Sequence, residues 1–163
     1  MNNFSITHRG NPLAESQYTI DLDEKVLTIP NGTDLVLDFN GCMGWTFKTY
    51  HNCYFNTSDD CTFNTGSHCT FKTGDNCTFD TGGGCSFKTG WDCTFDTGER
   101  CNFHTMSCCT FDTGDLCTFS LYNMDDCKFK SYSGGNSIIL NRENKNHYIL
   151  TEEFVTLQKV MNG

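Results

Sequence analysis

The sequence lacks long apolar runs, basic character and cysteine pairs at metal-binding spacing. No stretch approaches the ~18 consecutive apolar residues that span a membrane, so we expect no membrane insertion. The net charge is −9, so direct nucleic-acid binding is not expected, because it requires a basic surface. No Cys-x-x-Cys pair occurs among the 12 cysteines, which argues against a zinc site. We therefore expect neither metal nor cofactor.

The sequence also lacks the features of a secretory leader. The segment from Met1 to Ser5 has neither a basic nor an apolar region, which predicts that the chain stays in a reducing compartment. The chain has 163 residues and a mean hydropathy of −0.45, which is typical of one domain with a thin core.

An eight-residue phrase, Cys-Thr-Phe-x-Thr-Gly-x-x, runs unbroken through the middle of the chain. Phe recurs every eighth residue from Phe47 to Phe119, and Cys precedes it by two residues from Cys53 to Cys117. A unit this short cannot bury its own apolar face, so it must stack on its neighbours. The period therefore predicts an all-β single-chain β-solenoid.

Cys at position 1 and Phe at position 3 share one face of a strand, because side chains alternate. That face is predicted to form the interior, with Cys as a small, reduced core residue and disulfides disfavoured. Gly at position 6 is assigned to a tight turn that needs positive φ, and positions 7 and 8 carry turn residues. The predicted core comprises Phe63, Phe71, Phe79, Phe87, Phe95, Phe111, Cys61, Cys69, Cys77, Cys85, Cys93 and Cys109.

Position 4 points outward and indicates how many octads close one coil. Alternate octads carry Asp80, Asp96 and Asp112, while the octads between them carry Lys72, Lys88 and His104. This period of sixteen favours two octads per coil, with residues i and i+16 stacked. A trimeric needle with one octad per side is the alternative.

Three segments follow from the repeat. Residues 1–44 are predicted as a β-rich N-terminal cap, residues 45–124 as the octad solenoid, and residues 125–163 as a final irregular coil and C-terminal cap. Leu35–Phe39 is expected to lead into the first coil. The segment Phe154–Leu157 fits either a short strand or one face of a helix.

The motif Leu35-Val-Leu-Asp-Phe-Asn-Gly, then Trp45-Thr-Phe-Lys-Thr and the octads, resembles a group of small phage-encoded octapeptide-repeat proteins of unassigned role. The resemblance implies a location in the host cytoplasm or the virion. The chain departs from the pattern of these proteins at Met106, where Gly is expected. A weaker likeness, in the order Gly-x-x-small-Thr, links the chain to bacterial ice-nucleation repeats.

We expect no catalysis, because the same Ser, Thr and Cys recur at every level and form no distinct constellation. The leading hypothesis is a structural or interaction module, monomeric or weakly oligomeric, that contacts a virion or host protein through its position-4 columns and through Trp91. One alternative is an acidic DNA mimic built on Asp80, Asp96 and Asp112, helped by Glu99 and Asp115. A second is ice binding through a single threonine column on each face. Cation binding between stacked Asp residues is a poorer hypothesis.

Overall fold

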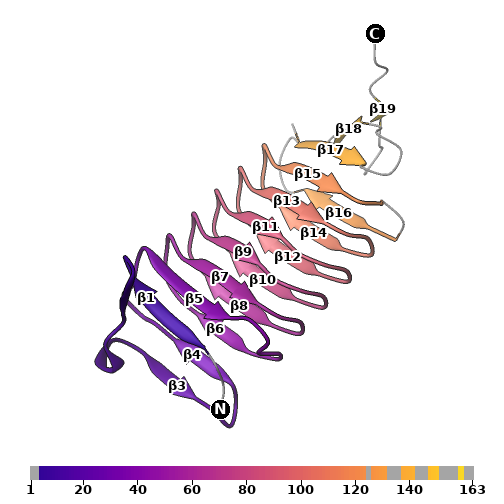
Figure 1. Cartoon of the computed structure of the whole chain (residues 1–163). Coiled ribbons are helices and arrows are strands. Elements are labelled where there is room, and N and C mark those ends of the chain that lie inside the picture. Colours follow the sequence, from indigo (N-terminus) through magenta and orange to yellow (C-terminus); the bar gives the residue numbers. More distant parts are fainter. Residues whose placement is uncertain (1–3, 124–125, 132–136, 142–146, 151–157, 160–163) are drawn as a thin grey trace.

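The computed structural model describes residues 4–123, 126–131, 137–141, 147–150 and 158–159, and it shows a rod of stacked coils (Figure 1). Each coil gives one strand to each of two sheets, and parallel strands recur about every 16 residues. The result is a β-solenoid of about seven turns. The predicted all-β solenoid with two octads per coil is confirmed.

The two sheets take alternate strands along the chain, as the two octads of each coil require. We call the 11-stranded sheet the long sheet and the 8-stranded sheet the short sheet. The long sheet contains β1 (Ser5–His8), β2 (Asn11–Pro12), β5 (Leu35–Phe39), β7 (Tyr54–Thr57), β9 (Thr70–Lys72), β11 (Ser86–Lys88), β13 (Asn102–Thr105), β15 (Thr118–Leu121), β17 (Ser137–Asn141), β18 (His147–Leu150) and β19 (Gln158–Lys159). The short sheet contains β3 (Thr19–Asp21), β4 (Val26–Thr28), β6 (Thr46–Lys48), β8 (Thr62–Thr65), β10 (Thr78–Thr81), β12 (Thr94–Thr97), β14 (Thr110–Thr113) and β16 (Lys128–Ser131).

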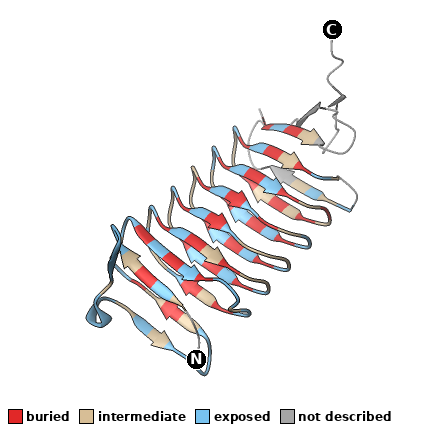
Figure 2. Ribbon diagram, viewed as in Figure 1, coloured by how far each residue is buried: buried red, intermediate tan, exposed pale blue. Residues whose placement is uncertain are grey.

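Register within the octads keeps each residue beside its counterpart 16 positions away. Phe79 lies beside Phe95 in the short sheet, and Phe71 lies beside Phe87 in the long sheet. Because side chains alternate along a strand, this register aligns every inward residue with an inward residue of the next coil. Buried and exposed residues therefore form stripes along the rod (Figure 2).

The interior is a double column of phenylalanine rings. Within one sheet, successive rings stack nearly flat, as Phe79 and Phe95 do with centroids 4.9 Å apart and planes 4° apart. Across the sheets the rings meet edge to face, with Phe79 and Phe87 at 5.1 Å and 75°. Offset-stacked and edge-to-face contacts are the favoured aromatic geometries, so the octad period places both kinds at every level. All predicted core residues are at most 2% exposed.

The solenoid continues beyond the octads at both ends. Strands β4 and β5 already pair in parallel with β6 and β7, so Val26–Phe39 follows the path of a coil. At the other end β16 places Phe129 on Phe111, although these residues are 18 rather than 16 positions apart, and β17 pairs with β15. Antiparallel strands complete each end: β1, β2 and β3 at the N-terminal end, β18 and β19 at the C-terminal end. Phe154–Leu157 lies outside the described residues.

The prediction that the position-6 glycines adopt positive φ is wrong. Positive φ occurs at position 8, for example at Asp60 (59°), His68 (60°) and Asn76 (55°), and not at the position-6 glycines. In the six octads with glycine at position 6, the glycine lies where adjacent coils approach closely, whereas Tyr50, Ser58, Met106 and Tyr122 occupy this position in the other four. A Cβ at Gly98 would lie 2.6 Å from the backbone N of Gly83, and a Cβ at Gly74 would overlap the Asp59 carboxylate. The glycine makes room for the preceding coil rather than for a left-handed backbone.

Candidate interaction faces and the corner hollow

The outward face of the short sheet carries the acidic column. Lys48, Asn64, Asp80, Asp96 and Asp112 follow one another on adjacent strands in direct register. Asp80 and Asp96 are exposed, and Asn64 Nδ2 donates to Asp80 Oδ2 at 3.3 Å. Adjacent rungs of a sheet are ~4.8 Å apart, so the three aspartates form a row of closely spaced like charges.

The outward face of the long sheet carries the basic column. Its register runs through Asn56, Lys72, Lys88, His104 and Ser120, of which Lys72, Lys88 and His104 are exposed. Asp38 precedes Asn56 in the same column, and Asn56 Nδ2 donates to it at 2.8 Å. Sequence reasoning missed Asp38 because the segment before Trp45 was assigned to the cap. Its spacing of 18 residues from Asn56, rather than 16, hid the register.

Position 2 gives each face a second outward column. On the short sheet it is Thr at every octad: Thr46, Thr62, Thr78, Thr94 and Thr110. On the long sheet the column is Tyr54, Thr70, Ser86, Asn102 and Thr118. The expectation of a threonine column on each face is therefore wrong for the long sheet. Flat threonine arrays are confined to one face, where they lie beside the charged column.

In the corners after the long-sheet strands, aspartate side chains accept hydrogen bonds from backbone N–H groups of the next coil. Asp59 Oδ1 accepts a hydrogen bond from the Asp75 N–H, and Asp75 Oδ1 accepts one from the Trp91 N–H, each at 2.9 Å. These bonds tie each corner to the next coil. The Trp91 side chain is 44% exposed, so the structure leaves this corner aromatic accessible.

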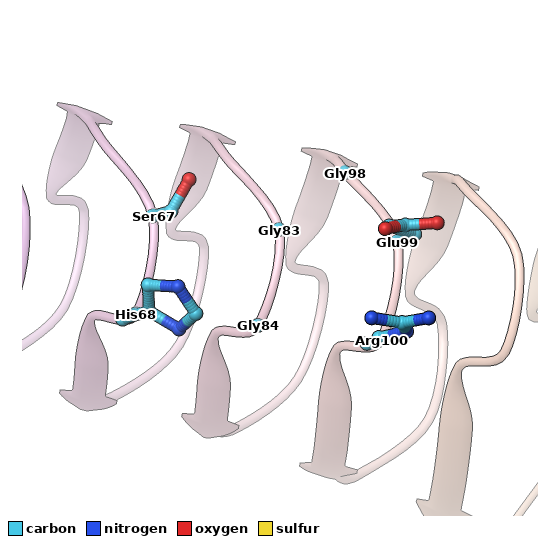
Figure 3. Close-up of a pocket in the computed structure, with 7 residues that line it drawn as sticks. All are labelled: Ser67, His68, Gly83, Gly84, Gly98, Glu99 and Arg100. Carbon is cyan, nitrogen blue, oxygen red and sulfur yellow. The ribbon is translucent and has the colours of Figure 1, made fainter.

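A hollow interrupts the other row of corners. Gly82, Gly83 and Gly84 occupy positions 6 to 8 of one octad, so this corner has no side chains. Gly83 and Gly84 line the hollow. The rest of the lining is Ser67 and His68 on the preceding coil and Gly98, Glu99 and Arg100 on the following coil (Figure 3). The volume is about 370 Å³. The triple glycine in the sequence is the signal that could have located it.

The hollow is polar and carries both charge signs. The His68 imidazole reaches over Gly84, where a Cβ would lie 2.6 Å from its Nδ1, while Glu99 and Arg100 are exposed on the far side. Ser67, His68 and Glu99 do not form a charge-relay arrangement. Ser67 and Glu99 stand two coils apart, at ~9.6 Å by strand spacing. The hollow can therefore accept a polar side chain from a partner, with Glu99 as acceptor and Arg100 as donor.

The buried cysteines form a ladder along each edge of the core. None of the 12 cysteines, all of which lie among the described residues, forms a disulfide. Nine of them lie in the ladders: Cys53, Cys61, Cys69, Cys77, Cys85, Cys93, Cys101, Cys109 and Cys117. Hydrogen bonds to neighbouring thiols, together with burial, raise the pKa of Cys69 and Cys101. The rung between them, Cys85, has a lowered pKa because of its side-chain hydrogen bonds with the Cys101 and Cys69 thiols. At the end of the rod, burial raises the pKa of Cys127 to about 11. The thiols thus act as packing and hydrogen-bonding groups inside the core.

No family model matches the chain, and neither curated proteins nor solved structures give a significant match. Within the described residues, no helix has the length and apolar character needed to span a membrane. The same part of the chain contains no group of three or more His, Cys, Asp or Glu side chains arranged to hold a metal ion.

Proposed function

We propose that this chain is a non-catalytic structural or interaction module that docks protein partners through the two broad faces of its solenoid. The observation that carries the proposal is the separation of charge between the faces. Asp80, Asp96 and Asp112 project from the short sheet, and Lys72 and Lys88 project from the long sheet. The proposal includes a phage origin and a virion or host partner, which are supported by the octad resemblance alone.

The rigidity of the scaffold supports this role. The charged side chains lie on strands whose inward neighbours are buried phenylalanines, such as Phe79 and Phe87. A site on regular strands holds its geometry more closely than one on loops, and it loses less conformational entropy on binding. Trp91 and the corner hollow lie at the edges of these faces, where they can add an aromatic and a polar contact.

The DNA-mimic alternative is less well supported by the geometry. Three aspartates at ~4.8 Å intervals supply about one negative charge per 4.8 Å, whereas duplex DNA carries one per ~1.7 Å of its axis. Lys48 ends the acidic run at the N-terminal side, and the opposite face is basic. An acidic face of this density fits a protein surface with a few cations better than a nucleic-acid groove.

Capture experiments with face variants test the proposal. The immobilised chain, at high dilution, is compared with Lys72→Glu/Lys88→Glu, with Asp80→Lys/Asp96→Lys, and with Glu15→Lys/Glu24→Lys as a control away from both faces. We expect at least one host or virion protein to bind the wild-type chain and the control, and to be lost from one face variant only. Identical protein sets on all four baits would contradict binding through the faces.

A further inference from the structure

The two position-4 columns carry charges of opposite sign in three of the coils. Asp38 in the long sheet shares a coil with Lys48 in the short sheet, at the N-terminal end of the rod. The next coil is neutral on both sides, with Asn56 and Asn64. The following coils reverse the order, with Lys72 facing outward opposite Asp80, and Lys88 opposite Asp96. Between Asp38 and Asp96, a change of sign in one column is therefore accompanied by a change of sign in the other. The register beyond Asp96 does not continue this pattern, because Asp112 is followed by Lys130 while His104 is followed by Ser120.

This complementarity cannot be satisfied within one chain. The two columns project from the outer surfaces of sheets that are packed ~10 Å apart through the phenylalanine core, so each pair points in opposite directions. Lys72, Lys88 and Asp96 make no ion pair among the described contacts, and all three are exposed. Within each column, like charges at ~4.8 Å repel one another. A surface that places a basic column against the acidic one, and an acidic column against the basic one, would supply the missing ion pairs and reduce the repulsion within each column.

A second copy of the chain supplies that surface at the correct spacing. Because both columns arise from the same coils, they share one rise per rung, and every rung of one column matches a rung of the other. We propose that copies of this chain stack side by side, the long-sheet face of one on the short-sheet face of the next, with rods parallel and coils level. In this register Asp38 meets Lys48, Lys72 meets Asp80, and Lys88 meets Asp96. The inference rests on the proposed role as an interaction module and names its partner.

The direction of the strands sets the lateral offset. The strands of one coil run in opposite directions in the two sheets, because each corner reverses the chain. Direct superposition therefore places position 4 of one copy over position 2 of the next. A slide of two residues, ~6.6 Å along the strands, brings the columns together. The threonines of the short face then lie beside the ion pairs rather than under them.

The size of the face predicts weak association. A rod of about seven coils is ~34 Å long, and strands of four to five residues are ~15 Å wide, so each face covers ~500 Å². The ~6.6 Å slide leaves ~8 Å of that width in contact, so a pair of faces buries ~600 Å², below the ~1,000 Å² of a stable specific interface. The interface is polar and its pairs are exposed, so salt should weaken it. Because the two contact faces differ, the contact is heterologous and leads to open stacks rather than closed dimers.

Charge-reversal complementation tests the proposal. Asp80→Lys/Asp96→Lys makes both faces basic, and Lys72→Asp/Lys88→Asp makes both faces acidic. Sedimentation velocity at low ionic strength, over micromolar to millimolar concentrations, is applied to the wild type, to each variant alone and to their equimolar mixture. We expect concentration-dependent association of the wild type. Each variant alone should associate at least tenfold more weakly, and the mixture should recover association.

Three controls keep the result interpretable. Circular dichroism and thermal midpoints establish that each variant is folded, and Asp80→Asn/Asp96→Asn supplies a milder variant that should also weaken association. Glu15→Lys/Glu24→Lys changes the net charge by the same amount as the basic variant and should leave association intact. A mixture that stays monomeric, or variants that each associate as the wild type does, would overturn the proposal. The capture experiment at high dilution is independent of this outcome, so failure here leaves the proposed function standing.

Discussion

The long and short sheets have the same interior and different exteriors. Inside, both present Cys and Phe at the same positions, and the rings of Phe79 and Phe87 are buried to nearly the same degree. Outside, one sheet carries Asp where the other carries Lys. Stacking constrains inward residues in every coil, because each must pack on an identical neighbour. Outward residues are limited only by strand propensity and charge, so the differences between the sheets mark where a partner can act.

The largest contrast between interior and exterior should appear in thiol reactivity. With iodoacetamide at pH 8, Cys42 and Cys108, which are partly exposed, should label first. Cys127 should follow more slowly, because its raised pKa leaves less thiolate at that pH. The nine ladder thiols should label ~10³-fold or more slowly, because they must wait for opening of the core. Mass spectrometry of timed samples measures the order, and early labelling of Cys77 or Cys85 would contradict the packed ladder.

Truncating a core ring should have the same effect in either sheet. Phe79→Ala in the short sheet and Phe87→Ala in the long sheet should each lower the free energy of unfolding by about 3–5 kcal/mol. Each variant loses the two stacked and two edge-to-face contacts that the deleted ring makes. Denaturant unfolding followed by circular dichroism measures both. A clear inequality between the two would show that the interiors of the sheets are not equivalent.

Alanine at a corner glycine should cost stability that depends on whether its methyl group meets backbone or a movable side chain. Gly98→Ala directs its methyl group at the Gly83 backbone and should cost about 1–3 kcal/mol. Gly74→Ala meets the Asp59 carboxylate instead, so part of its cost should disappear in the Gly74→Ala/Asp59→Ala double variant. Thermal unfolding of the single and double variants measures the coupling. Strict additivity for Gly74 and Asp59 would contradict the steric explanation.

The smallest effect should come from the charged columns. Asp96→Asn removes like-charge repulsion from the short face, and Lys88→Gln does the same on the long face. Each should raise the free energy of unfolding by no more than about 0.5 kcal/mol, and added salt should reduce the gain. Asp60→Asn, at an exposed corner, serves as control. Melting curves at two salt concentrations test this, and a loss of stability in both variants would mean that the columns are stabilised within the chain.

Part of the site could be predicted from the octads and part could not. The position-4 columns followed from counting, because an unbroken period fixes which residues stack. Asp38 was missed because the spacing changes to 18 and 20 residues before Trp45, and only the strand pairing shows that β5 continues the column. The hollow was missed because its lining comes from three coils. Its triple glycine is visible in sequence, but the neighbours His68 and Arg100 are brought together only by stacking.

The sequence by itself determined the repeat unit, the inward Cys and Phe, and the two octads per coil, because local alternation and a constant period leave little choice of register. Only the tertiary structure decided why six octads carry glycine at position 6 and why position 8 adopts positive φ. The reason is that these constraints come from the preceding coil rather than from neighbours along the chain. It also decided that Asp38 continues the long-sheet column and shares a coil with Lys48. That arrangement depends on how the longer coil before Trp45 closes, which the spacing of the octads does not specify.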